Sequence, residues 1–266
     1  MLRRSIAVYC LYFAQFLKSR LAYRWDFLAS ILANLIVSVS GLLFVLVLMT
    51  GGGVATLKGW TLEEVLFLYG YSMVAMAMFT TFAPNLYRFS DRYIIQGQFD
   101  RVLLRPLNSL FQVLFESFNL EAVGGLSVGL VLITYSSLKL RLTFSLFDCL
   151  WFVVSGLCGG VILLSVFIFL ASLSFHFEDR LGVAAPVFGL ISFARYPLPI
   201  FNEVIQFILR WVVPFAFVAF YPATHFLGRH DFAFYCYFTP VMAIITGTVA
   251  WKAWEFGVSR YASTGN

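Results

Sequence analysis

The residues from 88 to 106, RFSDRYIIQGQFDRVLLRP, place four arginines and two aspartates inside an otherwise apolar chain. Anionic lipid attracts cations alone, whereas alternating acids and bases can set the register of a specific protein partner. On a helical wheel with about 100° per residue, Ile95, Val102 and Leu103 share one side and most charges lie opposite. The pattern predicts an amphipathic helix at the membrane surface that docks a protein from the water. The plainer alternative is a basic loop that only satisfies the positive-inside rule.

A second polar group lies within an apolar stretch. Gln112, Glu116 and Asn119 are spaced i, i+4 and i+7, so a single helix would carry them on one face, with Glu121 off that stripe. An ionised carboxylate inside a bilayer is costly and usually faces a bundle interior or a watery path. The four residues are therefore candidates for the translocation path. Hydrogen bonds that hold neighbouring helices together are the open alternative.

Motifs for intrinsic catalysis are absent from the sequence. It contains no G-x-x-x-x-G-K-[ST], no G-x-S-x-G and no H-E-x-x-H. Its three histidines lack acidic partners at ligand spacing, and its four cysteines form no C-x-x-C pair, so no metal site or disulfide framework is expected. We expect no enzyme activity in this chain and no cofactor bound by it.

The elements that must position these residues are apolar helices. Of 266 residues, 61% are hydrophobic and only 12% are charged, against roughly a quarter charged in a soluble domain. The apolar runs are continuous, which excludes the two-residue alternation of a β-barrel. The fold class predicted is an all-α polytopic membrane protein. The net charge of +5 then indicates cytoplasmic loops that face lipid and protein, with no nucleic acid partner.

A spanning helix needs about 20 apolar residues, and we predict six. The predicted spans are 27–49, 62–83, 110–135, 147–174, 183–200 and 232–251. Residues 1–26 hold a short apolar run followed by basic residues, which predicts an uncleaved cytoplasmic interfacial helix instead of a signal peptide. Residues 27–266 are then a single transmembrane domain. Because most of the 18 lysines and arginines fall on the side of residues 1–26 and 88–106, both termini are expected inside.

Residues 201–222 are apolar but interrupted by Arg210 and Pro214. Two half-helices that enter one leaflet and return would place the proline at a break, so we predict a re-entrant outer hairpin between the fifth and sixth spans. The candidate outer-gate residues are Pro214, Tyr221 and Pro222. An aromatic belt at the interface is the alternative reading of the tyrosine and phenylalanines there.

Four motifs in this order carry a family resemblance: GWTLEE at 59–64, QGQFDRVLLRP at 96–106, VVPFAFVAFYPA at 212–223 and RYASTGN at 260–266. Across nearly its whole length the chain resembles the short bacterial type-2 ABC transporter permeases. The resemblance implies a six-helix exporter subunit of the bacterial inner membrane that pairs with a second copy or a sister permease. Separate ATP-binding subunits would bind ATP and Mg²⁺ and dock from the cytoplasm.

The resemblance also implies that the helix in 1–26 and a coupling helix in 88–106, between the second and third spans, form the docking surface. The candidate docking residues are Asp91, Arg92, Gln98, Asp100, Arg101 and Arg105. We therefore expect the permease subunit of an ATP-driven exporter of an amphipathic or hydrophobic molecule, a cation if Glu116 and Glu121 face the path. A passive channel or lipid scramblase, active without ATP, and a membrane assembly subunit are the alternatives.

Overall fold

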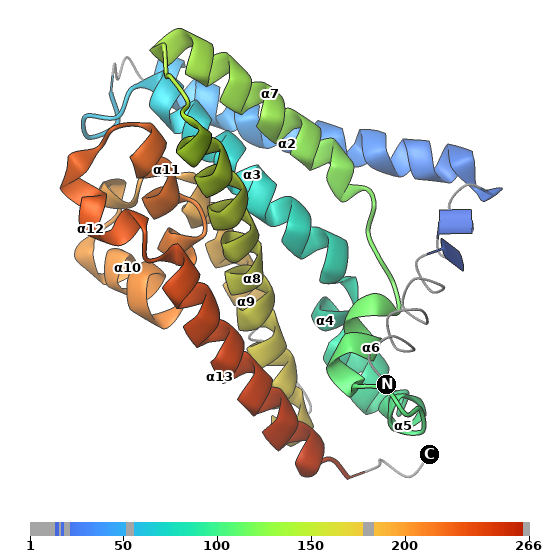
Figure 1. Ribbon diagram of the computed structural model, residues 1–266. Helices are drawn as coiled ribbons and strands as arrows, with labels where there is room; N and C mark the ends of the chain where they lie inside the picture. Colours follow the sequence, from blue (N-terminus) through green and yellow to red (C-terminus); the bar gives the residue numbers. More distant parts are fainter. Residues whose placement is uncertain (1–13, 16, 19–21, 52–55, 178–183, 263–266) are drawn as a thin grey trace.

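The computed structural model describes residues 14–15, 17–18, 22–51, 56–177 and 184–262 (Figure 1). Most of the predicted interfacial helix, 1–26, lies outside these residues. The regular elements among the described residues are all helices, which confirms the predicted all-α class. By length and apolar composition, five of these helices can cross a membrane, or six if one bent pair counts as a single span. The chain is a multi-pass membrane protein.

Five long helices build the core of the protein. They are α2 (Arg24–Gly51), α3 (Leu62–Phe82), α7 (Ala122–Leu140), α8 (Leu146–Phe177) and α13 (Thr239–Ser259). Helix α3 packs against both α7 and α8, while α2 packs along α7 and α13 along α8 (Figure 1). Helix α3 is the most enclosed of the five and α2 the most exposed. The apolar outer face of α2 is thus available to lipid or to another protein.

A close contact between two glycines sets the distance between α3 and α7. A Cβ atom on Gly70 would lie 2.7 Å from the Gly129 carbonyl oxygen, and one on Gly129 would lie 2.8 Å from the Gly70 carbonyl oxygen. Real Cβ atoms do not come that close to backbone oxygens, so only glycine fits on either side. The two helices therefore touch through their backbones at this level.

The remaining elements are short. One group, α4 (Pro84–Tyr87), η1 (Ser90–Ile95), α5 (Phe99–Leu103) and α6 (Ser109–Phe115), lies at one end of the bundle (Figure 1). The others are α9 (Ala184–Ile191), η2 (Ser192–Arg195), η3 (Leu198–Ile200), α10 (Glu203–Phe207), η4 (Ile208–Val212), η5 (Phe215–Phe217), α11 (Phe220–Phe226), η6 (His230–Phe232) and α12 (Ala233–Cys236).

The predicted third span, 110–135, is wrong as a single helix. Helix α6 ends at Phe115 and α7 begins only at Ala122. Polar groups in the connection bond to other parts of the chain. The Asn119 amide nitrogen donates to the Thr81 carbonyl, 3.0 Å away, and the Asn119 side chain accepts from the Glu121 amide. Such side-chain and tertiary bonds compete with the helical backbone ladder and break it.

The predicted fifth span, 183–200, is also wrong as a continuous helix. Its described part is divided among α9, η2 and η3, and the apolar helical piece Pro186–Arg195 is shorter than a span. Tyr196 precedes Pro197 and has extended backbone angles, φ −117° and ψ 155°. A proline disfavours helical geometry in the residue before it, which ends the helix here. The predicted sixth span, 232–251, lies within the candidate span His230–Ser259, in which the long helix α13 begins at Thr239.

The chain bends sharply near Pro214. The helical pieces Glu203–Val212 and Phe215–Phe226 meet at an angle of 76°, with the proline in the break between them. By length the pair fits one broken span or a re-entrant loop. The predicted end of this unit, residue 222, lies within α11. Pro222 lies in the first turn of α11, where a missing N–H costs nothing, and the helix continues to Phe226.

Candidate functional site

The polar segment 88–106 forms two short helices instead of the predicted single amphipathic helix. The π-helix η1 ends at Ile95 and α5 begins at Phe99. Gly97 between them has φ +68°, in the left-handed region that side chains other than glycine rarely adopt. The chain therefore turns at Gly97, and the two helices do not share one helical wheel.

The inner side of this loop is an aromatic anchor. Phe89 and Phe99 are almost completely buried. The Phe89 ring lies 5.0 Å from Trp254 of α13 and 5.3 Å from Phe175 of α8, measured between centroids. The Phe99 ring lies 5.0 Å from the Phe175 ring. Burial of such rings is the main source of stability at a contact of this kind, so the loop is fixed to the ends of α8 and α13.

The outer side of the loop carries exposed apolar and charged residues together. We call this surface the loop face; its residues are Asp91, Ile95, Gln96, Arg101, Leu103, Leu104 and Arg105. Leu104 has 84% of its surface exposed and Ile95 54%. The helical wheel placed Ile95, Val102 and Leu103 on one side, but only Val102 is buried. The turn at Gly97 places Ile95 in a different helix from Val102 and Leu103, and within α5 Val102 is buried while Leu103 is exposed.

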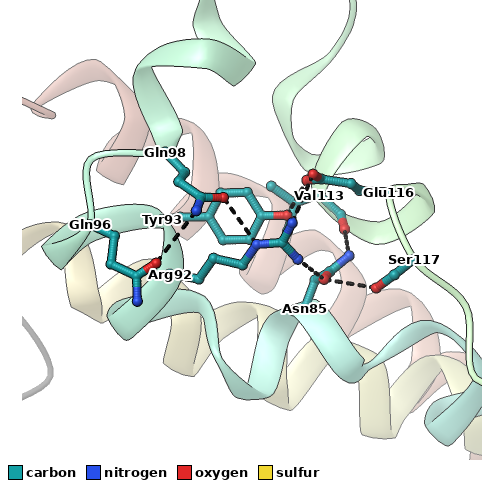
Figure 2. A network of polar contacts seen from close by, with 8 residues as sticks. All are labelled: Asn85, Arg92, Tyr93, Gln96, Gln98, Val113, Glu116 and Ser117. Carbon is teal, nitrogen blue, oxygen red and sulfur yellow. Dashed lines mark hydrogen bonds and ion pairs between the residues drawn. The ribbon is translucent and has the colours of Figure 1, made fainter.

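A polar network built around Arg92 joins the loop to the bundle (Figure 2). The Arg92 Nη2 atom lies 3.0 Å from Glu116 Oε1 and forms an ion pair. Its Nε donates to Gln98 Oε1 at 3.0 Å, and its Nη1 donates to Asn85 Oδ1 at 3.2 Å. One guanidinium thus connects η1 with α4, with the start of α5 and with the residue that follows α6. Three such bonds fix its position because the guanidinium donors have a rigid planar geometry.

The same network holds Asn85 and Tyr93. The Asn85 Nδ2 atom donates to the Val113 carbonyl at 2.6 Å, and Ser117 Oγ donates to Asn85 Oδ1 at 2.8 Å (Figure 2). The buried Tyr93 hydroxyl donates to Glu116 Oε2. Burial raises the pKa of Tyr93, and the hydrogen bond to the Glu116 carboxylate raises it further. The phenol therefore stays a proton donor at neutral pH, and both Glu116 oxygens are engaged.

The three residues expected on one helix face, Gln112, Glu116 and Asn119, are not brought together on one, and Glu121, expected off that face, lies apart as well. Gln112 is buried in α6, where its Nε2 donates to the Val102 and Leu107 carbonyls, each at 3.0 Å. Glu116 belongs to the Arg92 network, and Asn119 lies in the connection between α6 and α7. Glu121 is the N-cap residue of α7. Their shared face is wrong because α6 stops at Phe115; a role in the path stays a prediction.

Two contacts that the sequence did not reveal attach the loop to the C-terminal helix. The Tyr261 hydroxyl donates to Asp100 Oδ1 at 3.0 Å, and the Trp254 Nε1 atom donates to Ser109 Oγ at 3.0 Å. Aromatic residues with a polar tip near a helix end are the only sequence signal for such contacts. Asp100, expected to meet a partner, is thus engaged inside the chain.

A family model described as ABC-2 family transporter protein matches residues 35–265, which is most of the chain. The chain belongs to the ABC-2 transporter family. This confirms the resemblance to type-2 ABC permeases drawn from the motifs. No curated protein and no solved structure matches it. Membership in the ABC-2 family makes the chain a membrane permease component that associates with an ABC ATP-binding subunit.

The outer-gate candidates of this ABC-2 protein lie in packed surroundings. Tyr221 and Pro222 are buried in α11, and Pro214 is buried at the bend. The Tyr221 hydroxyl accepts a hydrogen bond from Arg210 Nε at 2.6 Å, and its ring stacks on Tyr235 with 5.0 Å between centroids. Tyr221 and Pro222 lie in α11, which Figure 1 shows at the end of the bundle away from α5, and Pro214 directly precedes η5. Their gate role stays a prediction.

Proposed function

We propose that this ABC-2 protein is the transmembrane permease subunit of an ATP-driven exporter. It forms the translocation path with a second copy or a sister permease in the bacterial inner membrane, with both termini in the cytoplasm. Separate ATP-binding subunits hold ATP and Mg²⁺ and hydrolyse the nucleotide. The chain itself binds no cofactor and catalyses no reaction.

The observation that carries this proposal is the rigid attachment of the loop combined with its exposed outer face. The aromatic anchor and the Arg92 network fix the loop to α4, α6, α8 and α13. A large exposed leucine, Leu104, surrounded by charges is typical of the centre and rim of a protein interface. A loop held this way moves with the helices, so a motor that binds two loop positions with different free energies shifts the permease between two states.

The geometry divides the docking residues into two groups. Arg92, Gln98 and Asp100 are partly buried, bond to other elements of the chain and position the loop. Asp91, Arg101 and Arg105 lie on the loop face, and we assign the contact with the motor to them together with Leu104. The segment therefore acts as the coupling helix of the exporter, in two pieces joined at Gly97. The bent pair around Pro214 acts as the re-entrant outer hairpin.

The test is co-purification of an ATP-binding subunit from native membranes in mild detergent. We compare the natural chain with an Arg101→Glu/Leu104→Asp double variant of the loop face. The matched control is Lys139→Glu, an exposed reversal near the other end of α7, about 25 Å along that helix from its start. We expect the ATP-binding subunit with the natural chain and the control, and its loss from the double variant.

Three other results would change the conclusion. If the natural chain carries no ATP-binding subunit and moves ions or lipid in vesicles without ATP, it is a channel or scramblase. If the ATP-binding subunit binds but no candidate substrate changes its ATPase rate, the chain is an assembly subunit. If the double variant retains the subunit, the docking surface lies elsewhere. Unchanged elution of each variant on size exclusion shows that the comparison is between folded proteins.

A further inference from the structure

A hollow of about 460 Å³ opens beside the start of the loop. Helix α3, helix α4, helix α9 and the connection between α6 and α7 all contribute to its wall. This volume lies in the range of sites that hold drug-sized molecules, about 300–1,000 Å³. It is separate from the Arg92 network, because none of the network's side chains lines it.

One wall of the hollow is aromatic. Phe188 of α9 lies edge-on to Tyr87 of α4, with 5.5 Å between ring centroids, and 6.5 Å from Phe79 of α3. Tyr87 is 50% exposed and Phe188 41% exposed, so both rings present apolar surface to the opening. Exposed rings grouped in a concave surface favour a ligand with an apolar or aromatic part.

The lining also carries hydrogen-bond donors. Arg88 is exposed, and its guanidinium has no hydrogen bond or ion pair to any other residue that the structure describes. The Asn119 side chain accepts from the Glu121 amide through Oδ1 at 2.9 Å, which leaves its Nδ2 group able to donate. No aspartate or glutamate is among the described residues of the lining. A guanidinium and an amide donor in the same lining are complementary to phosphate, sulfate or carboxylate oxygens.

We propose that this hollow binds an anionic amphiphile, with its acidic headgroup at Arg88 and Asn119 and its apolar part against Phe79, Tyr87 and Phe188. The identification of that amphiphile as the exported substrate rests on the proposed function; the binding site does not. The expectation of a cationic substrate depended on Glu116 and Glu121, and of these Glu116 is paired with Arg92. Arg88 directly precedes the buried Phe89, so a headgroup held there contacts the first residue of the loop that meets the motor.

The test measures binding by isothermal titration to the full chain in nanodiscs of zwitterionic phosphatidylcholine, without ATP or any motor subunit. The probe is dihexanoyl phosphatidic acid. Dihexanoyl phosphatidylcholine tests the headgroup charge, and inorganic phosphate alone separates a free anion from an amphiphile. Arg88→Gln and Phe188→Ala alter the two walls. Lys252→Gln removes the same charge from an exposed position on α13 and is the matched control.

We expect phosphatidic acid to bind the natural chain and the Lys252→Gln control with affinities within twofold of each other. Arg88→Gln should weaken binding at least tenfold, and Phe188→Ala should weaken it severalfold. The two comparators should bind at least tenfold more weakly than phosphatidic acid. Equal binding to Arg88→Gln, or equal binding of phosphatidylcholine or of phosphate alone, overturns the proposal. Because no motor is present, a failed co-purification leaves this result intact, and the two ideas fail independently.

Discussion

Arg92 and Glu116 form an ion pair at 3.0 Å across 24 residues of sequence. The pair joins the first helix of the loop to the residue that ends α6, and Tyr93 bonds the second carboxylate oxygen. Glu116 was expected to line a path and Arg92 to meet a partner. Their pairing gives both residues a shared structural task, which is to hold the loop rigidly against the bundle, and their roles in the path and in docking stay predictions.

The first prediction concerns the strength of this pair. Both side chains are about one third exposed, so water screens their attraction and the coupling should be modest. In a double-mutant cycle of Arg92→Gln and Glu116→Gln we expect a coupling energy of about 1 kcal/mol. Thermal unfolding in mixed micelles measures it. Glu255→Gln, an exposed acid on α13, should not change stability. Additive effects of the two Arg92 and Glu116 substitutions would contradict a direct pair.

The second prediction concerns the contact between α3 and α7. In Gly129→Ala the new Cβ would approach the Gly70 carbonyl oxygen to 2.8 Å, so the helices must separate. We expect a loss of about 2 kcal/mol or more, measured by thermal unfolding. Gly189→Ala in α9 is the control, because its Cβ would meet nothing within 4 Å. That change should leave stability unchanged or raise it slightly. Equal stability of both variants would show that α3 and α7 are not in backbone contact.

A third prediction concerns Arg229, far from the loop. Its Nε and Nη2 atoms donate to the two Glu64 carboxylate oxygens at 2.9 and 2.7 Å, and its guanidinium lies 4.7 Å from the Trp60 ring centroid. Lysine keeps the charge but cannot make the paired bonds or stack in the same way. We expect Arg229→Lys to lower the free energy of unfolding by about 2 kcal/mol. Arg141→Lys, at an exposed position, should not change the free energy of unfolding. A loss of the same size in Arg141→Lys would mean that the exchange of arginine for lysine destabilises the protein without any contribution from the Glu64 and Trp60 contacts.

The sequence predicted the long uninterrupted helices closely, and physical reasons separate them from the failures. The spans 62–83 and 147–174 correspond to α3 (Leu62–Phe82) and α8 (Leu146–Phe177) within a few residues. In both, an apolar run long enough to span leaves the backbone no partner except itself. The run 110–135 is equally long, but its polar residues bond to α3, to η1 and to the Glu121 amide. A hydropathy profile does not show these hydrogen-bond partners, so the break in the helix could not be predicted from it.

The candidate site was predictable as a segment but not as a geometry. The mixed charges of 88–106 located the loop. Sequence spacing alone, however, assigned Arg92 to partner docking and Glu116 to the translocation path. Their pairing depends on the turn at Gly97 and on the end of α6, which bring η1 against the start of the connection. The helical wheel failed for the same reason, since it assumes one helix on both sides of Gly97.

The last prediction uses the attachment of Tyr261 to Asp100. Burial and the hydrogen bond to the Asp100 carboxylate raise the pKa of Tyr261 from its ordinary 10.0 to about 12. In the unfolded chain the phenol loses its proton near pH 10, whereas in the folded chain it keeps the proton until about pH 12. The folded state therefore binds more protons between these values, and the stability that this provides below pH 10 is lost as the pH rises toward 12. In Tyr261→Phe this contribution is absent, so the midpoint of thermal unfolding should fall less steeply above pH 10 than in the natural chain. Parallel declines in the two proteins would mean that the Tyr261 hydroxyl is not held by Asp100.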